Sequence, residues 1–113
     1  MFFNSAPGFK NITPRDLREK SDKNEDFLLL DVRTPGEHAQ QAIEGSYLLP
    51  VQELSFRAGE LPKDKEIVVY CRVGNRSAFA ASYLSRLGYK VKNLDGGIVA
   101  WNSTASDATY ARA

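Results

Sequence analysis

Along this chain, short apolar runs alternate with segments of helix length, a pattern that is compatible with only a few folds. The two strongest runs are Phe-Leu-Leu-Leu at residues 27–30 and Ile-Val-Val-Tyr at residues 67–70. Short, continuous apolar runs are typical of strands covered on both faces, which occur in parallel sheets flanked by helices. We therefore predict an α/β fold built on a mainly parallel sheet.

The other elements are expected around these two runs. Residues 67–70 are the most β-branched and are predicted to form a central strand. Thr-Pro pairs at 13–14 and 34–35 predict helix starts, because threonine caps a helix and proline suits its first position. Strands are predicted at residues 11–12, 27–30, 46–49, 67–70 and 91–94, helices at 14–20, 35–40, 77–87 and from 98 onward, a helical turn or two at 51–56, and a surface connection at 57–65. The apolar residues of the helix at 77–87 recur three apart along one side and are Ala78, Ala81, Leu84 and Leu87, with Gly88 as the stop.

A chain of 113 residues with 42% hydrophobic residues suits one domain with a packed core. Its net charge of +1 provides no overall field that would attract nucleic acid or an anionic membrane. A single cysteine excludes an internal disulfide, and a single histidine, His38, leaves a structural zinc site without ligands. No apolar stretch approaches the ~18 residues of a membrane span, and no secretory leader is recognised, so a cytoplasmic location is expected.

Cys71 directly follows the predicted central strand and precedes the helix at 77–87. In a parallel sheet, ligands bind at the loops that leave the carboxyl ends of the strands. A tight loop entering a helix turns several N–H groups and the positive end of the helix dipole toward one point, and Gly74 permits the backbone conformation that this needs. Arg72 and Arg76 add two cations. Each feature favours the thiolate, so we predict that Cys71 is a nucleophile in a small anion-binding loop.

The simpler interpretation of a lone cysteine is a small, buried apolar residue without chemistry. Packing alone does not explain why a cysteine, a glycine and two arginines gather within six residues between a buried strand and a helix. The nucleophile is therefore the preferred interpretation.

Three separated motifs resemble the single-domain rhodaneses, the thiosulfate and related sulfurtransferases. Cys-Arg-Val-Gly-Asn-Arg-Ser at residues 71–77 resembles the active-site loop of that family. Two further motifs extend the resemblance. Upstream of this loop lie Leu-Asp-Val-Arg at 30–33 and Glu37, and downstream of it lie Asn-Leu-Asp-Gly-Gly at 93–97 and Trp101.

The resemblance covers residues 10–102, which are predicted to form one rhodanese domain between an N-terminal extension at 1–9 and a C-terminal tail at 103–113. It implies a three-layer α/β/α rhodanese-like fold with about five strands in a mainly parallel sheet. It also implies a reaction in which the cysteine takes the outer sulfur of thiosulfate or a related anionic donor as a persulfide. That sulfur then passes to cyanide, a thiol or a protein. No metal or organic cofactor is needed, and no nucleic acid or membrane partner is expected.

By this resemblance, Cys71 is the catalytic residue and the loop after it binds the substrate. The substrate-binding residues are Arg72, Val73, Gly74, Asn75, Arg76 and Ser77. Arg72 and Arg76 are expected to bind the anionic donor, and the backbone N–H groups to stabilise the sulfur. The hydroxyl of Ser77 either lies near the sulfur or caps the helix, and the sequence does not decide between these.

Two other functions stay open. A module of this fold can act as a non-enzymatic sulfur carrier or bind a protein partner, although the intact cysteine and arginines argue against an inert module. Phosphatases and arsenate reductases of this fold have a loop one residue longer than that of the sulfurtransferases. Here four residues separate Cys71 from Arg76, so the smaller loop fits a sulfur atom better than a phosphate group.

Residues Asp31, Arg33 and Glu37 are expected to be structural, as a buried or edge ion pair beside the active-site loop, rather than an acid-base set. His38 is expected at the surface. Gly96 and Gly97 are expected to form a turn.

Trp101 is expected to pack the last helix on the sheet. Residues 41–46 read Gln-Ala-Ile-Glu-Gly-Ser, where the family often has Gly-His-Ile-Pro-Gly-Ala. This departure concerns local packing and leaves the predicted chemistry unchanged.

Overall fold

The computed structural model describes residues 8–112, and the side chains of residues 8–104. Within that range, five strands form one sheet in which every neighbouring pair is parallel. The strands are β1 (Lys10–Ile12), β2 (Phe27–Asp31), β3 (Tyr47–Leu48), β4 (Glu66–Tyr70) and β5 (Val91–Leu94), in the spatial order β1-β5-β4-β2-β3. The predicted α/β fold is confirmed, and β4 is the central strand.

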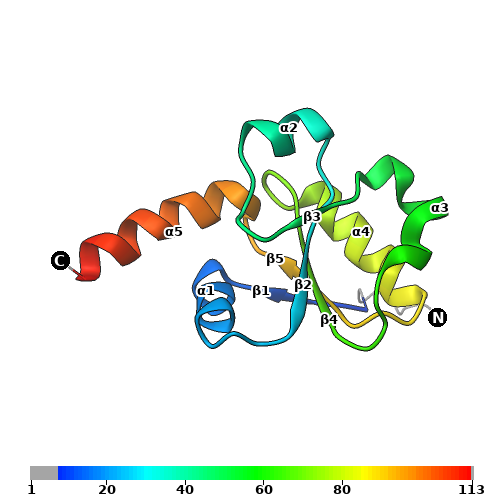
Figure 1. Ribbon diagram of the computed structural model, residues 1–113, viewed down its shortest axis with the longest axis horizontal. Coiled ribbons are helices and arrows are strands. Elements are labelled where there is room, and N and C mark those ends of the chain that lie inside the picture. Colours follow the sequence, from blue (N-terminus) through cyan, green and yellow to red (C-terminus); the bar gives the residue numbers. More distant parts are fainter. Residues whose placement is uncertain (1–7, 113) are drawn as a thin grey trace, which may run out of the picture.

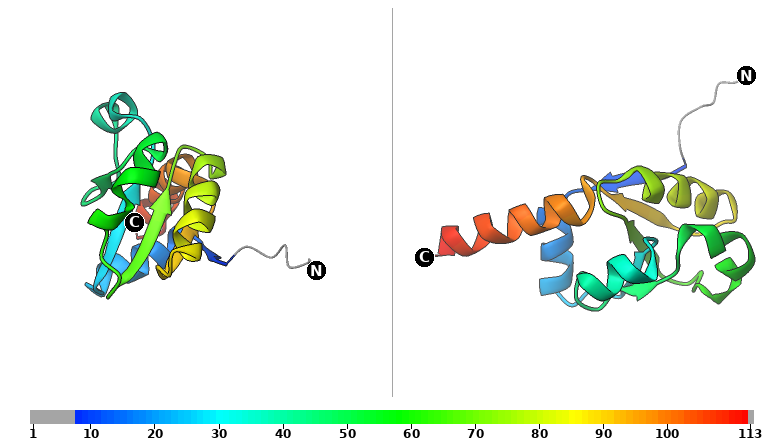
Figure 2. Two further views of the ribbon diagram at one scale, coloured as in Figure 1. Left: turned by 90° about the vertical axis from the view of Figure 1, so that its right-hand side faces the viewer. Right: turned by 90° about the horizontal axis from the view of Figure 1, so that it is seen from above.

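Helices cover both faces of the sheet. They are α1 (Pro14–Asp22), α2 (Pro35–Gln40), α3 (Leu54–Arg57), α4 (Asn75–Arg86) and α5 (Gly97–Arg112), with the 3₁₀ turns η1 (Val51–Glu53) and η2 (Ala58–Glu60) on either side of α3. Figure 1 shows α1 and α5 on one side of the sheet and α3 and α4 on the other, which confirms the three layers. The far end of α5 projects beyond the body of the domain (Figure 2).

The central strand supplies side chains to two apolar cores. Ile67 and Val69 belong to the core covered by α3 and α4, whereas Val68 and Tyr70 belong to the core covered by α1 and α5. Successive side chains of a strand point to opposite faces, so a strand buried on both faces needs an unbroken apolar run. All four side chains are fully buried, as that run predicts.

The helix after the cysteine loop differs in detail from the prediction. α4 begins at Asn75, two residues early, because the left-handed conformation of Gly74 (φ +119°) turns the chain directly into the helix. Ala81 and Leu84 of the predicted side are buried, but Leu87 is 43% exposed. The strict three-residue spacing was wrong because a helix has about 3.6 residues per turn, and the buried side chains are therefore Ser77, Ala80, Ala81 and Leu84.

Two connecting segments are also more ordered than predicted. α1 continues to Asp22, and Thr13 caps its start by accepting a hydrogen bond from the Asp16 N–H at 3.1 Å. The predicted surface connection at 57–65 contains η2, and Ala58 within it is buried and accepts a hydrogen bond from the Tyr89 hydroxyl at 2.6 Å.

The chain ends add little to the site. Most of the predicted extension at 1–9 lies outside the described residues, and α5 continues as a helix past residue 102. Trp101 is partly buried and packs against the core on its face of the sheet. No helix within residues 8–112 has the length and apolar character needed to cross a membrane.

Candidate active site

Cys71 lies where the path of the chain through the sheet reverses. From β2 the chain moves outward to β3, whereas from β4 it moves the opposite way to β5. The loops that leave β2 and β4 therefore diverge, which opens a crevice at the carboxyl ends of these strands. The loop after β4 begins with Cys71, and the loop after β2 leads into α2, which lies above this end of the sheet (Figure 1).

The sulfur of Cys71 receives three hydrogen bonds from the start of α4. The N–H groups of Gly74 and Ser77 donate to it at 3.1 and 3.4 Å, and the Ser77 hydroxyl donates at 3.3 Å. Cys71 is 1% exposed and Ser77 is fully buried. Ser77 lies within α4, whose N-cap is Gly74, so its hydroxyl lies at the sulfur and does not cap the helix.

These contacts determine whether the pKa of the Cys71 thiol is raised or lowered. Burial alone raises the pKa of the Cys71 thiol, because the interior disfavours a charged group. The hydrogen bonds from Ser77 and from the backbone of Gly74 and Val73 outweigh burial, so the pKa lies below its ordinary value. A larger thiolate fraction at neutral pH makes the sulfur a better nucleophile.

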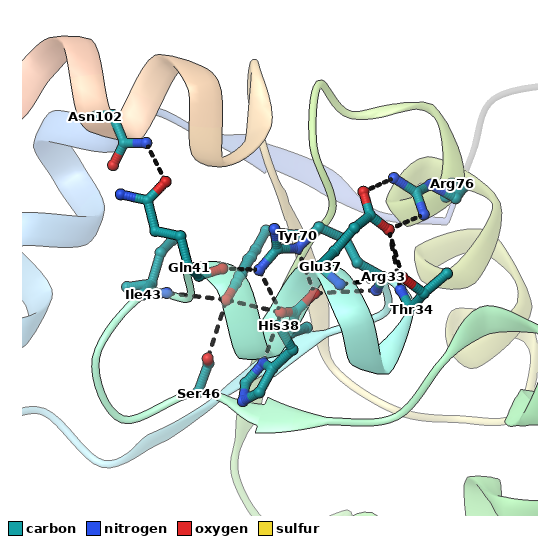
Figure 3. Close-up of polar contacts among 11 residues, drawn as sticks. Arg33, Thr34, Glu37, His38, Gln41, Ile43, Ser46, Tyr70, Arg76 and Asn102 are labelled. Carbon is teal, nitrogen blue, oxygen red and sulfur yellow. Dashed lines mark hydrogen bonds and ion pairs between the residues drawn. The ribbon is translucent and has the colours of Figure 1, made fainter.

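The two arginines of the loop have different surroundings. Arg76 forms a bidentate ion pair with Glu37, at 2.7 and 2.9 Å (Figure 3). This arginine is the main cause that holds the pKa of Glu37 at about 2. Arg72 is exposed, and its guanidinium has no charged partner among residues 8–104. Of these two arginines, Arg72 is therefore the one whose guanidinium can bind an incoming anion without first breaking an ion pair.

Glu37 is also held by its own helix. The Thr34 hydroxyl accepts a hydrogen bond from the Glu37 N–H, and the Glu37 carboxylate accepts one from the Thr34 N–H. This reciprocal capping box orients the carboxylate at the start of α2. The predicted structural set therefore separates: Glu37 pairs with the cysteine loop, whereas Asp31 and Arg33 pair with each other.

Asp31 and Arg33 form a buried ion pair at the end of β2. Both are almost fully buried, and the guanidinium donates to the two carboxylate oxygens at 2.9 and 2.7 Å. His38 Nδ1 lies 2.8 Å from the same carboxylate, while its side chain, still 28% exposed, keeps the predicted place at the surface. α2 lies over the end of β2 and brings the His38 side chain, labelled in Figure 3, into contact with Asp31. Sequence spacing does not reveal this contact between two elements.

The segment that departs from the family pattern packs on this network. Arg33 donates to the Gln41 carbonyl at 2.6 Å. The Tyr70 hydroxyl accepts a hydrogen bond from the Ile43 N–H at 3.1 Å and lies 2.9 Å from the Ser46 hydroxyl (Figure 3). Backbone groups and a short hydroxyl thus connect residues 41–46 to the sheet without the family's usual histidine and proline.

The start of α5 holds the first peptide groups of the cysteine loop. The Ile98 N–H donates to the Cys71 carbonyl at 3.0 Å, and the Val99 N–H donates to the Arg72 carbonyl at 3.2 Å. Gly97 comes so close that a Cβ added there would lie 2.4 Å from the Arg72 carbonyl oxygen. Sequence reasoning assigned this glycine only to a turn, although its place in the third family motif was the available signal.

A pocket of about 450 Å³ lies beside the loop, between α2 and α5. Its lining residues are Arg33, Glu37, Gln40, Gln41, Arg72, Ile98, Val99 and Asn102. The buried sulfur of Cys71 does not line it. Within residues 8–104, no group of three or more His, Cys, Asp or Glu side chains is arranged to hold a metal ion.

Known proteins resemble this chain over most of its length. The model of the Rhodanese-like domain family matches residues 13–104. A sulfurtransferase of Allochromatium vinosum is 45% identical over 91 residues, which cover 80% of this chain and 85% of that protein. The thiosulfate sulfurtransferase GlpE of Pseudoalteromonas translucida is 34% identical over 100 residues, covering 88% of this chain and 94% of that protein.

A solved structure agrees with these sequence matches. The crystal structure of a rhodanese-related protein from Thermoplasma volcanium has a TM-score of 0.79 and 35% identity, and the match covers 85% of this chain and 93% of that one. Fold, loop and sequence thus lead to one assignment. The chain belongs to the rhodanese-like domain family, among relatives that are named sulfurtransferases.

Proposed function

We propose that this protein moves a sulfane sulfur from thiosulfate or a related anionic donor to a thiophilic acceptor through a persulfide on Cys71. The observation that carries the proposal is the buried Cys71 sulfur with three hydrogen bonds from α4. Such donors stabilise negative charge both on the thiolate and on the persulfide that replaces it. They allow the thiolate to form without a neighbouring base.

The first step balances without a cofactor. The Cys71 thiolate attacks the outer sulfur of thiosulfate, a new S–S bond forms, and the bond to the sulfonate sulfur breaks. Sulfite leaves with that electron pair, and the outer sulfur stays on Cys71 as a persulfide anion. The sequence has no second cysteine, so the sulfur must leave on an external acceptor.

The loop residues have distinct proposed roles. The exposed cation of Arg72, which has no charged partner among the described side chains, attracts the donor and offsets charge on the departing sulfite. The backbone from Val73 to Ser77 surrounds the sulfur. Arg76 acts as a positioning residue through its ion pair with Glu37, which joins α4 to α2.

The same ion pair argues against the alternative phosphatase function. Phosphate binding by a cysteine loop requires a guanidinium that is free to take two phosphate oxygens. Here Glu37 already occupies both donor positions of Arg76. A non-enzymatic sulfur carrier or a protein-binding module is the remaining alternative. A carrier differs from an enzyme only in the rate at which its persulfide is discharged.

Mass spectrometry after incubation with thiosulfate tests the proposal. The wild type should gain the mass of one sulfur atom, and Cys71→Ala should not. Cyanide should then remove this mass and yield thiocyanate. If the wild type gains no sulfur and forms no thiocyanate, the proposed function is wrong, whereas a persulfide that cyanide discharges only slowly would identify a carrier.

Arg72→Ala tests the donor site. We expect a higher KM for thiosulfate, because the variant removes the exposed cation of the loop. The matched control is Arg86→Ala, an exposed arginine at the opposite end of α4. An equal KM in both variants would remove Arg72 from the donor site.

A further inference from the structure

The Cys71 sulfur is closed off from solvent. The residue is 1% exposed, and it does not line the pocket between α2 and α5. A molecule that reacts with Cys71 has to contact this sulfur directly. One wall of the crevice must therefore move before any reaction at Cys71.

The cysteine loop is the fixed wall of the crevice. Ile98 and Val99 donate hydrogen bonds to its first two carbonyls, and Gly97 packs against the same peptide groups. Ser77 and Ala80 of α4, which follow the loop, are fully buried. Displacement of the loop would break these hydrogen bonds and open the core.

The other wall is residues 34–42, which contain α2 and which we call the strap. None of these residues is buried, whereas Arg33 and Ile43 on either side are only 4% and 5% exposed. α1, α3 and α4 each bury at least one side chain, but α2 buries none and projects from the end of the sheet (Figure 2). The strap thus has fixed ends and little packing to hold its middle, which is typical of segments that open locally.

Two polar contacts, which we call the latch, hold the strap to the helices across the crevice. Glu37 pairs with Arg76 of α4 at 2.7 and 2.9 Å, and Gln41 accepts a hydrogen bond from Asn102 of α5 at 3.1 Å (Figure 3). The ion pair is partly exposed, with 35% of the Arg76 side chain and 29% of the Glu37 side chain accessible. Partly exposed pairs contribute little stability, so the latch can open without unfolding the domain.

The remaining polar contacts of the strap form its hinge. His38 contacts Asp31, and the Gln41 carbonyl accepts a hydrogen bond from Arg33. Both partners belong to the end of β2, from which the strap departs. The strap can therefore turn away from α4 and α5 while these two contacts persist.

The latch lies close to the reacting sulfur. The pKa of the Arg76 guanidinium is raised mainly by its hydrogen bonds to Glu37, and the charge of Cys71 adds to this effect. Opening at this ion pair thus occurs beside Cys71 and not at a remote part of the surface.

From this geometry we infer that the strap is a gate, held shut by the latch, whose opening admits molecules to Cys71. A molecule as small as thiosulfate needs a slight opening, whereas a bulky one needs the latch to break. The gate therefore selects the reaction partners of Cys71 by size. As a filter for sulfur donors it rests on the proposed function, but access to the thiol can be measured without sulfur transfer.

Alkylation of Cys71 by two reagents with one reactive group tests the inference. Iodoacetamide is small, and pyrenyl iodoacetamide carries a large uncharged ring system. Each rate is divided by the rate of the same reagent with N-acetylcysteine, which removes the difference in intrinsic reactivity. The ratio of the two normalised rates does not depend on the pKa of Cys71, because both reagents attack the same thiolate. Wild type should prefer iodoacetamide at least about tenfold, because the open state is the minor one.

Two variants weaken the latch. Glu37→Gln removes the charge of the ion pair, and Asn102→Leu removes the hydrogen bond to Gln41. Each should reduce the preference for iodoacetamide about threefold, the effect expected for one partly exposed polar contact. The matched control is Glu53→Gln, which weakens the partly exposed ion pair within α3, also at 2.7 Å, and should leave the preference unchanged.

Equal normalised rates of the two reagents in the wild type would overturn the inference. An unchanged preference in both latch variants would overturn it too, and so would an equal reduction in Glu53→Gln. Any of these results together with persulfide formation from thiosulfate would mean that only this inference fails. The expected preferences without persulfide formation would mean that only the proposed function fails.

Discussion

Gly97→Ala is predicted to damage the active-site loop from outside it. The added Cβ would lie 2.4 Å from the Arg72 carbonyl oxygen and 2.6 Å from the Cys71 carbonyl oxygen. Both are backbone atoms, so they cannot rotate away as a flexible side chain does. Gly97 also has φ +62°, a conformation that alanine adopts only with strain.

The expected loss of stability follows from these two effects. The positive φ costs an alanine roughly 1–2 kcal/mol. Moving the two carbonyls weakens their hydrogen bonds with Ile98 and Val99, each worth about 1 kcal/mol. Together these terms give about 3–4 kcal/mol, or a decrease in Tm of about 10–15 °C for a domain of this size.

Two other glycines separate the causes. Gly45 has φ +85° but no atom within 4 Å of an added Cβ, so Gly45→Ala should lose only the conformational part, about 1–2 kcal/mol. Gly59 has neither a positive φ nor a neighbour within 4 Å. Gly59→Ala should match the wild type or gain up to about 1 kcal/mol, because alanine restricts the unfolded chain.

Urea titration followed by the fluorescence of Trp101, the single tryptophan, measures these stabilities. The rate of persulfide formation from thiosulfate should fall at least tenfold in Gly97→Ala, because its loop carbonyls move, and should stay at the wild-type value in Gly45→Ala. If the two variants lose the same stability, the close approach of Gly97 to the loop contributes nothing, and the reasoning is refuted.

Three further predictions concern charge. The pKa of Glu37 is lowered from 4.5 to about 2, so its ion pair with Arg76 stabilises the fold above pH 5 and is lost as the pH falls toward 2. Because the pair is partly exposed, Glu37→Gln should cost about 1 kcal/mol of stability at pH 7 and almost nothing near pH 2. A difference in urea midpoints that stays constant across this pH range would contradict this assignment. Asp31→Asn leaves the buried Arg33 cation without its carboxylate and should cost roughly 3–5 kcal/mol of stability in urea titration. Its control, Glu19→Gln, removes an exposed ion pair and should cost about 0.5 kcal/mol or less. Equal losses in the two variants would show that burial of the pair does not set the cost. Ser77→Ala should raise the pKa of Cys71 and slow its alkylation by iodoacetamide at pH 7 severalfold. The control Ser55→Ala alters an exposed serine and should change neither. If the alkylation rate of Ser77→Ala depends on pH as in the wild type, the Ser77 hydroxyl does not lower the pKa of Cys71.

Local rules explain why part of the structure was predictable. The capping threonines before α1 and α2 act within one helical turn, and both helices start where the Thr-Pro pairs indicate. The unbroken apolar run of β4 indicates by its composition alone that the strand is buried on both faces. Such signals extend over a few neighbouring residues, so a sequence displays them directly.

Packing, in contrast, decided the environment of the candidate site. Glu37 and Arg76 are 39 residues apart, and no local pattern shows that they meet. The same is true of Gly97 and the cysteine loop, and of the pocket between α2 and α5. The contact of His38 with Asp31 also depends on where α2 lies and not on the sequence of its own helix.

The sequence alone determined that Cys71 follows a strand buried on both faces and precedes a helix start, because alternation, capping and loop length are short-range properties. Tertiary structure alone decided that Arg76 pairs with Glu37, that Arg72 has no charged partner among residues 8–104, and that the Ser77 hydroxyl lies at the sulfur. The physical reason is that these outcomes depend on how distant elements pack at the ends of parallel strands, where the topology brings together segments that the sequence keeps apart.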